Sequence, residues 1–495
     1  MGWADARFAD RYGFARVDRA TMSEDDMRTT GVKDGAGAGR ATGRSAVLAV
    51  SLGGLLFGFD TAVISGVTAA LRHVFALDAV GLGSAVSAAL VGTLVGALGA
   101  GHPGDRYGSR TVLIWIAGAY IISALGSAMS TSLPEFVGFR FLGGLAIGGS
   151  SVLAPVYIAE VASAARRGFM VASFQLNIVI GILVAYVSNF VIGAMASGDL
   201  VWRLKLSVAA LPSALFLVML LRIPPSPRWL VQRGEEGKAR AAITALGMGD
   251  PDALVQAFRN HHPATAARLS WAAHRKPILL AVAIALFNQL SGINAILYYL
   301  GDIFASAGFD SVSSDVQSVA IGIANLIATF VGMTVIDRIG RKPLLLIGAT
   351  GTGLALLGVA WIYSTGHAQA WLLPALIGFI LFFGMSQGAV IWVYLSEIFP
   401  TGVRARGQAI GSTTHWALNA LIAFGFPVIS QHTRAAPFWI FAVAMAMQFI
   451  IVWRFFPETR GVSLEAMDAM ITRGHAAASG ASASPHAEPE TERDA

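Results

Sequence analysis

The sequence predicts an all-α integral membrane protein with 12 transmembrane helices in two six-helix bundles related by a pseudo-twofold axis. The first observation is composition: 55% of the 495 residues are hydrophobic, 13% are charged and the mean hydropathy is +0.63. Soluble proteins have about 25% charged residues. The second observation is a series of apolar segments, and the third is a set of motifs that appears once in each half of the chain. These observations place the chain among polytopic membrane proteins.

The chain begins with a polar, Gly-rich stretch, residues 1–44, which lacks the apolar core of a signal peptide. We expect it to be a disordered arm, and Met22 and Met27 are alternative starts, which leaves open whether residues 1–21 belong to the protein. Twelve segments follow, each long enough to cross roughly 30 Å of hydrocarbon. They cover residues 46–71, 82–101, 111–130, 134–157, 169–195, 203–222, 277–305, 315–336, 343–363, 370–395, 405–430 and 437–456.

One long polar insert divides the twelve segments into two sets of six. We therefore expect an N-terminal bundle at 45–222, a linker at 223–276, a C-terminal bundle at 277–457 and a tail at 458–495. Within the linker, the apolar periodicity between Glu235 and Leu246 predicts short surface helices.

The distribution of positive charge predicts the orientation. Basic residues gather in the connections after even-numbered segments and in the linker, with Arg72 and Arg434 as exceptions. By the positive-inside rule, the linker and both termini lie in the cytoplasm and the chain is a multi-pass protein of a bacterial inner membrane. Topology thus explains the net charge of +6, and we expect no nucleic-acid partner. The basic residues are Arg106, Arg110, Arg166, Arg167, Arg338, Arg341, Lys342, Arg404 and Arg406.

The two halves repeat each other at an offset of about 235 residues. Asp105-Arg106-Tyr107-Gly108 returns as Asp337-Arg338-Ile339-Gly340, and Glu160 with Arg167 returns as Glu397 with Arg404. Pro224-Pro225-Ser226-Pro227-Arg228 is answered by Pro457-Glu458-Thr459-Arg460-Gly461. Duplicated bundles of this kind are typical of carriers that work by alternating access.

Asp60 is the charged residue that most strongly indicates function. It lies in the first segment, in a run from Ala46 to Leu71 with no other acidic residue. A carboxylate at that depth costs on the order of 3 kcal/mol on insertion scales, which favours a proton carrier or the partner of a buried cation. Arg140 is the only cation within the fourth segment, so we expect it to pair with Asp60. A purely structural ion pair is the alternative.

Six motifs at these spacings resemble the sugar porters of the major facilitator superfamily, over roughly residues 46–465. This family includes bacterial xylose, arabinose and galactose proton symporters and animal glucose facilitators. The motifs are Gly101-x-x-x-Asp105-Arg106-x-Gly108, Pro224-x-Ser226-Pro227-Arg228-Trp229-Leu230, Gln289-Leu290-Ser291-Gly292-Ile293-Asn294, Asp337-Arg338-x-Gly340-Arg341-Lys342, Ser396-Glu397-Ile398-Phe399-Pro400 and Pro457-Glu458-Thr459. In the symporters of this family, the aspartate at the position of Asp60 carries the proton and the arginine is its partner.

The resemblance also implies a sugar site in which amides bind hydroxyl groups and aromatic rings stack on the sugar. Gln175 and Ile182 lie two helical turns apart and share a face, and Gly292 is a place where the seventh segment can break. Interhelical hydrogen bonding is the alternative for Asn325 and Asn419, and core packing for Trp416. The residues implied are Phe57, Gln175, Ile182, Asn288, Gln289, Asn294, Tyr298, Asn325, Gly388, Trp392, His415 and Asn419.

Charged residues at the helix ends resemble the network that closes the cytoplasmic gate in the family. Charges that only set the topology are the alternative. These residues are Asp105, Arg106, Glu160, Arg167, Asp337, Arg338, Glu397 and Arg404. The chain departs from the family at Asn288 and His415, where glutamine or asparagine is usual, and this leaves the substrate open.

We therefore expect a carrier that imports a monosaccharide, a pentose or hexose, with a proton. The alternatives are a facilitative uniporter, a polyol or inositol symporter and, more remotely, a sugar sensor that does not transport. The chain has no cysteine, and no nucleophile with an adjacent base or metal-ligand cluster is found in the membrane segments. We expect no enzyme activity, no metal and no cofactor. The expected partners are the sugar, the proton and the lipid bilayer, with the chain working as a monomer.

Overall fold

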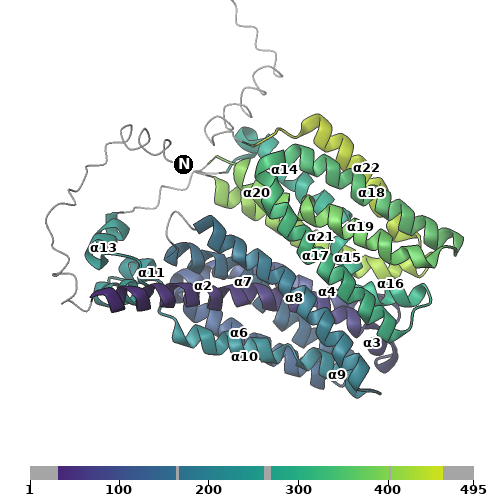
Figure 1. Cartoon of the computed structure of the whole chain (residues 1–495), viewed down its shortest axis with the longest axis horizontal. Helices are drawn as coiled ribbons and strands as arrows, with labels where there is room; N and C mark the ends of the chain where they lie inside the picture. The colour runs from purple at the N-terminus through teal and green to yellow at the C-terminus, as the bar shows by residue number, and fades with distance from the viewer. Residues whose placement is uncertain (1–31, 163–166, 261–268, 401–402, 461–495) are drawn as a thin grey trace, which may run out of the picture.

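The computed structural model describes residues 32–162, 167–260, 269–400 and 403–460 (Figure 1). Within these ranges the chain is helical with short connections, and no strand occurs. The all-α architecture predicted from composition is therefore confirmed for the described residues.

The first six spans form the N-terminal bundle. Its first span is α2, which continues through a short 3-10 turn into α3, and its sixth is divided into α9 and α10. The elements are α2 (Val32–Val63), η1 (Ile64–Gly66), α3 (Thr68–Val74), α4 (Ala79–Gly99), α5 (Gly101–Tyr107), α6 (Ser109–Met129), α7 (Leu133–Val161), α8 (Arg167–Met195), α9 (Leu200–Ser207) and α10 (Ala210–Arg222).

The start of α2 differs from the expectation of a disordered arm up to residue 44. The helix begins at Val32. Alanines, which have the highest helix propensity, alternate with glycines in this stretch. Gly43 also lies against the backbone carbonyl of Leu246 in the linker, so the first turns of α2 rest on another element. The structure of residues 1–31 lies outside the described part of the chain.

The linker contains three short helices, α11 (Pro227–Gln232), α12 (Glu236–Leu246) and α13 (Pro251–Asn260). The Ser226 side chain caps α11 by accepting a hydrogen bond from the backbone N–H of Trp229. Apolar residues of the three helices, among them Leu230, Ile243 and Val255, form a small core of their own. We call the end of the molecule that carries these helices the linker end and the opposite end the far end (Figure 1).

The last six spans form the C-terminal bundle, in which the seventh span is broken twice and the tenth once. The elements are α14 (Trp271–Leu290), α15 (Ile293–Tyr298), α16 (Leu300–Ser306), α17 (Ser311–Ile339), α18 (Arg341–Thr365), η2 (Gln369–Trp371), α19 (Leu372–Met385), α20 (Gln387–Glu397), α21 (Arg404–Ser430) and α22 (Ala436–Phe455).

Among the described residues, eleven helical runs have the length and hydropathy of a membrane span. The predicted span that is not among them is the eleventh, 405–430. It is α21, which is long enough but carries polar residues such as Thr414, His415 and Asn419 along its length. It packs between α14 of its own bundle and α4 of the other. A helix with so much protein around it needs less apolar surface than one that faces lipid.

The two bundles lie side by side and contact each other at the far end. There α15 and α16 reach η1 and α3, while α4 packs on α21 and α8 on α17 along the flanks (Figure 1). The Tyr186 hydroxyl of the N-terminal bundle donates to the backbone oxygen of Leu297 at 3.1 Å. Gly301 approaches η1 so closely that a Cβ would lie 2.5 Å from the backbone oxygen of Ser65. The far end is therefore closed.

Candidate functional site

Asp60 and Arg140 form an ion pair inside the N-terminal bundle. Asp60 comes from α2 and Arg140 from α7, two helices that pack against each other. Arg140 binds both carboxylate oxygens, and its Nη2 lies 2.9 Å from Oδ2. The side chains are 5% and 14% exposed. A guanidinium and a carboxylate held in this bidentate geometry make two parallel charge-assisted hydrogen bonds.

Arg140 lines a small cavity together with three hydroxyl groups. Among the described residues, no side chain or backbone group pairs with its Nε atom. Next to it lies a cavity of about 20 Å³ lined by Tyr120, Ser123 and Ser127, which is enough space for about one water molecule. These groups can bind the guanidinium when the carboxylate does not, so Arg140 has a second set of partners available.

Asp60 also lies close to the other bundle. A second small cavity, about 10 Å³, is lined by Phe57, Asp60 and Arg140 from the N-terminal bundle and by Tyr298 from α15. The Tyr298 hydroxyl accepts a hydrogen bond at 3.2 Å from the amide of Asn419 in α21. The Phe57 ring lies 5.4 Å from the Trp416 ring, again between bundles. Tyr298 thus lies between the ion pair and the polar side chains of the C-terminal bundle.

The C-terminal bundle holds a buried chain of amides. The Asn294 amide donates to Gln289 Oε1 at 3.1 Å, and the Gln289 amide lies 2.9 Å from His415 Nε2. Because an amide nitrogen only donates, the His415 ring accepts this bond and is neutral in this arrangement. Trp392 lies beside it, with ring centroids 5.2 Å apart. Three helices, α14, α15 and α21, therefore present polar groups to one place.

This geometry depends on the break in the seventh span. Gly292 has φ of 81° and separates α14 from α15, as its sequence position predicts. A side chain there would require the left-handed conformation and would also collide with the Phe441 ring. The break lets Asn294 turn back and bond to Gln289, which an unbroken helix would carry away from it.

Other residues implied by the resemblance lie outside this chain of amides. Asn288 points to the opposite side, donating to the backbone oxygen of Gln387 at 3.4 Å. Asn325 is 7% exposed and lies against Gly384 of α19. Gln175 is partly buried in α8, two turns from the buried Ile182, and Gly388 lies in the first turn of α20 beside Phe383. The structure therefore places part of the expected sugar site together and leaves the rest around it.

Several charged residues of the linker end bond within one half of the chain or to the linker. Arg341 lies 2.8 Å from Glu397 and 3.0 Å from Asp337, and Glu397 also accepts from Thr459 at 2.6 Å. The backbone oxygens of Asp105 and Arg106 accept from Trp229 and Arg233 of the linker.

Three further residues of the expected cytoplasmic gate are described at this end. Glu160 lies near Ser226 and Arg228, Arg338 is exposed and Arg404 is half-buried. The side chain of Arg167 lies outside the described residues.

Two charged residues outside the predicted sites form a buried pair between the bundles. Lys205 of α9 and Asp315 of α17 lie 2.8 Å apart and are 4% and 6% exposed. Each stands at the edge of an apolar segment, where the sequence alone does not distinguish a buried charge from one in a loop. A charged residue within a membrane segment is in itself an indication of function. This is the sequence signal by which Lys205 and Asp315 could have been found.

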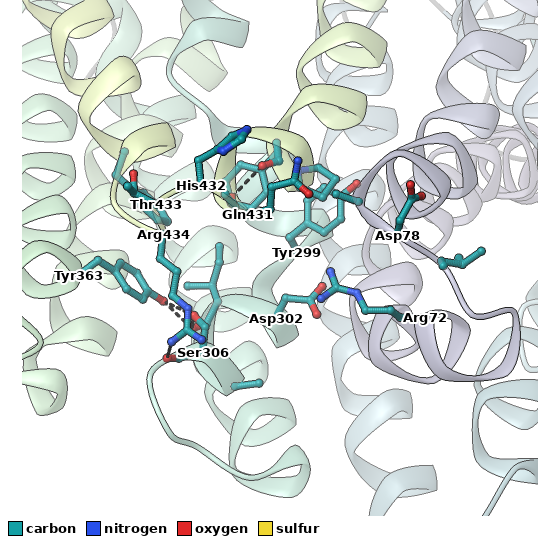
Figure 2. A pocket seen from close by; sticks show the side chains of 18 residues that line it. Arg72, Asp78, Tyr299, Asp302, Ser306, Tyr363, Gln431, His432, Thr433 and Arg434 are labelled. Carbon is teal, nitrogen blue, oxygen red and sulfur yellow. Dashed lines mark hydrogen bonds between the residues drawn. The ribbon is translucent and has the colours of Figure 1, made fainter.

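A larger cavity of about 670 Å³ lies at the far end, away from the amide chain (Figure 2). It is lined by Arg72 and Asp78 on one side and by Tyr299, Asp302 and Arg434 on the other. In Figure 2 the Arg72 guanidinium extends towards Asp302 across the junction of the bundles. The cavity lies beyond the closed contact of η1 and α16, so it forms a vestibule.

Two six-helix bundles, closed at one end around buried polar groups, define a membrane transporter. The chain belongs to the sugar (and other) transporter family, whose pattern matches residues 46–471. This confirms the family that the six motifs predict.

Two curated relatives show how far this likeness extends. The D-xylose-proton symporter of Escherichia coli K12 is 32% identical over 471 residues, which cover 86% of this chain and 95% of that protein. The glucose facilitated diffusion protein of Zymomonas mobilis is 34% identical, covering 86% and 96%.

Solved structures of related proteins share the fold. The partially occluded inward-open form of the E. coli xylose transporter XylE matches with a TM-score of 0.76 at 31% identity, covering 86% of this chain and 100% of that one. The proton:xylose symporter XylE bound to 6-bromo-6-deoxy-D-glucose matches with a TM-score of 0.69 at 31% identity, covering 87% and 99%.

Proposed function

We propose that the protein imports a monosaccharide together with a proton by alternating access. The observation that carries this proposal is the position of Asp60, which is paired with Arg140 and also lines a cavity with Tyr298 of the other bundle. Tyr298 in turn bonds Asn419, beside the amide chain of Gln289. A change in the charge of Asp60 is therefore transmitted to the groups that bind sugar.

The mechanism follows from the two sets of partners of Arg140. When Asp60 is charged, the bidentate pair holds α2 and α7 together. When Asp60 takes a proton its attraction for the guanidinium falls, and the hydroxyls of Tyr120, Ser123 and Ser127 bind Arg140 instead. Gln289, Asn294 and His415 exchange their mutual hydrogen bonds for bonds to sugar hydroxyls. The substrate is neutral because these residues are amides and a neutral ring.

The linker end faces the cytoplasm in this proposal, together with both termini. The contacts of the bundles at the far end then make the described conformation inward-facing. The higher TM-score to the inward-open relative supports this assignment. The protein works as a monomer in a bacterial inner membrane. One charge moving through 100 mV supplies about 2.3 kcal/mol, enough to accumulate a neutral sugar roughly fifty-fold.

The test is sugar-dependent alkalinisation outside lightly buffered, right-side-out vesicles, screened with xylose, arabinose, galactose, glucose, fructose and inositol. We expect a proton signal with one of them. Asp60→Asn abolishes that signal while sugar counterflow continues, because the amide neither takes up nor releases a proton. Asp199→Asn, an exposed carboxylate of the same bundle, leaves both unchanged. Sugar uptake without proton movement in the natural protein would make it a uniporter.

A further inference from the structure

Lys205 belongs to the N-terminal bundle and Asp315 to the C-terminal bundle. Lys205 Nζ donates to Asp315 Oδ2 at 2.8 Å and to the backbone oxygen of Gly66 at 3.1 Å. The second bond ties Lys205 to the N-terminal bundle, where η1 begins the contact with α16. Asp315 lies in the first turns of α17, at the far end of the C-terminal bundle. The hydrogen bond between the two side chains therefore crosses the junction that is closed in this conformation.

The surroundings of the pair leave room for it. A Cβ on Gly193 of α8 would lie 3.5 Å from Lys205 Nζ and only 3.0 Å from Asp315 Oδ2, which is closer than an ordinary contact. The glycine thus opens the space that the two polar ends occupy between α8, α9 and α17. Both residues are more than nine-tenths buried, so neither charge is solvated by bulk water while the far end is closed.

We propose that Lys205 and Asp315 form a charge-matching gate at the far end, which allows the bundles to close there only when each charge finds the other. This inference rests on the alternating-access part of the proposed function. When the far end opens, α9 and α17 separate and both charges reach water, where each is solvated on its own. When it closes, both lose water, and their mutual attraction compensates for this loss.

The sign of the effect of mutations follows from this balance. Lys205→Met leaves Asp315 to be buried without a partner on closing, and Asp315→Leu leaves Lys205 in the same position. An uncompensated buried charge is strongly unfavourable, so both single variants favour the open far end. Replacing both residues removes both charges, and a pair of apolar residues in such a place is often as stable as the ion pair. The double variant therefore closes again.

The experiment uses the absence of native cysteine, because one introduced thiol reports without background. Ser65→Cys is the reporter: Ser65 is 4% exposed, and its backbone oxygen lies against Gly301 across the closed junction. Its rate of labelling by a membrane-impermeant maleimide, in right-side-out vesicles, measures how often the far end opens. Thr433→Cys, exposed at the same end, is labelled in parallel to count the assembled protein.

We expect Lys205→Met and Asp315→Leu each to increase the labelling rate at Ser65→Cys about tenfold, and the double variant to return it near its original value. The matched control is Arg203→Gln on the same helix. Arg203 donates to the backbone oxygens of Ala128 and Ser130 within its own bundle, so its loss leaves the labelling rate unchanged.

The proposal is overturned if the single variants label at the original rate while Thr433→Cys labels normally, or if the double variant labels as fast as the singles. Proton uptake with sugar is measured on the same vesicles. If proton uptake is absent while the labelling pattern is as expected, the result would count against proton coupling and leave the charge-matching gate in place. Fast labelling of Ser65→Cys in the unmodified background would instead contradict the closed far end itself.

Discussion

Tyr298 lies between the ion pair of the N-terminal bundle and Asn419 of the C-terminal bundle. Its hydroxyl binds Asn419, and its ring lines the cavity that also contains Asp60. The other polar end of Asn419, its Oδ1 atom, has no partner among the described residues. Among the described residues, the Tyr298 hydroxyl is thus the partner of the Asn419 side chain, and Asn419 Oδ1 is left to bind a sugar hydroxyl.

Tyr298→Phe tests this role. Without the hydroxyl the Asn419 side chain is no longer held in one orientation, and the loss of its hydrogen bond to a sugar hydroxyl costs about 1–3 kcal/mol, or roughly five-fold to a hundred-fold in binding. We expect the KM for sugar uptake to rise within that range. Tyr363→Phe, a change at the far end where Tyr363 bonds Ser306, serves as the control. An unchanged KM would show that Asn419 is not part of the sugar site.

At the scale of elements, the start of α18 depends on a side chain from the end of the chain. Glu458 accepts hydrogen bonds from the backbone N–H groups of Arg341 and Lys342, at 3.0 and 2.9 Å. Burial alone would raise the pKa of Glu458, but the backbone donors of Arg460, Arg341, Lys342 and Thr459 together hold it below its ordinary value. The carboxylate thus caps α18 and fixes the segment after α22 to it.

Glu458→Gln should lower the stability of the folded protein by about 1 kcal/mol at neutral pH, because the amide keeps a weaker acceptor and loses the charge at the helix start. Since the folded pKa is depressed, the stabilisation is present above the ordinary pKa of 4.5 and is lost as the pH falls below it. Thermal unfolding in detergent at pH 7 and pH 4 measures this. A difference between the two proteins that grows on acidification would contradict it.

Sequence patterns predict the elements well where periodicity or a special residue marks them. The twelve spans, the linker helices and the break at Gly292 fall in this group. The break at Ser386 is less clearly marked, since Gly384 and Gly388 stand two residues to either side of it and the Ser386 side chain packs against Gly348 of α18. The division of the sixth span at Val208 and Ala209 is marked by Pro212, which has no N–H to bond to the backbone oxygen of Val208.

At the scale of the whole molecule, closure of the far end requires close contact between the bundles. Gly301 is one point of close contact, next to Ser65. The substitution Gly301→Val places side-chain atoms where the backbone of η1 lies. We expect it to hold the far end open and to reduce uptake at least tenfold, since small residues are what allow such close approach.

Labelling of Thr433→Cys and of a thiol at Ser65, as described above, separates an open far end from a protein that has not folded. Gly378→Val is the control, because a Cβ there meets no atom within 4 Å. Normal uptake by Gly301→Val would mean that the far end does not close so tightly during transport.

The sequence indicates the pairing of Asp60 with Arg140 because each is the single charge of its kind in its segment. It does not indicate Lys205 with Asp315, since that pair depends on how one bundle is placed against the other. The same holds for the contact of Phe57 with Trp416 and for the end at which the bundles meet. Contacts within a bundle can be predicted from patterns along the chain, whereas contacts between the bundles depend on the conformation.

Dissolved salt weakens the attraction between charges that water surrounds, over a Debye length of about 8 Å at physiological ionic strength. Lys205 and Asp315 are 4% and 6% exposed, so salt ions do not reach the pair while the far end is closed. The exposed Asp337 and Arg338 at the linker end have no such shelter. A closure that depends on the buried pair is therefore insensitive to ionic strength, and the carrier keeps its conformational balance in dilute and in saline surroundings alike.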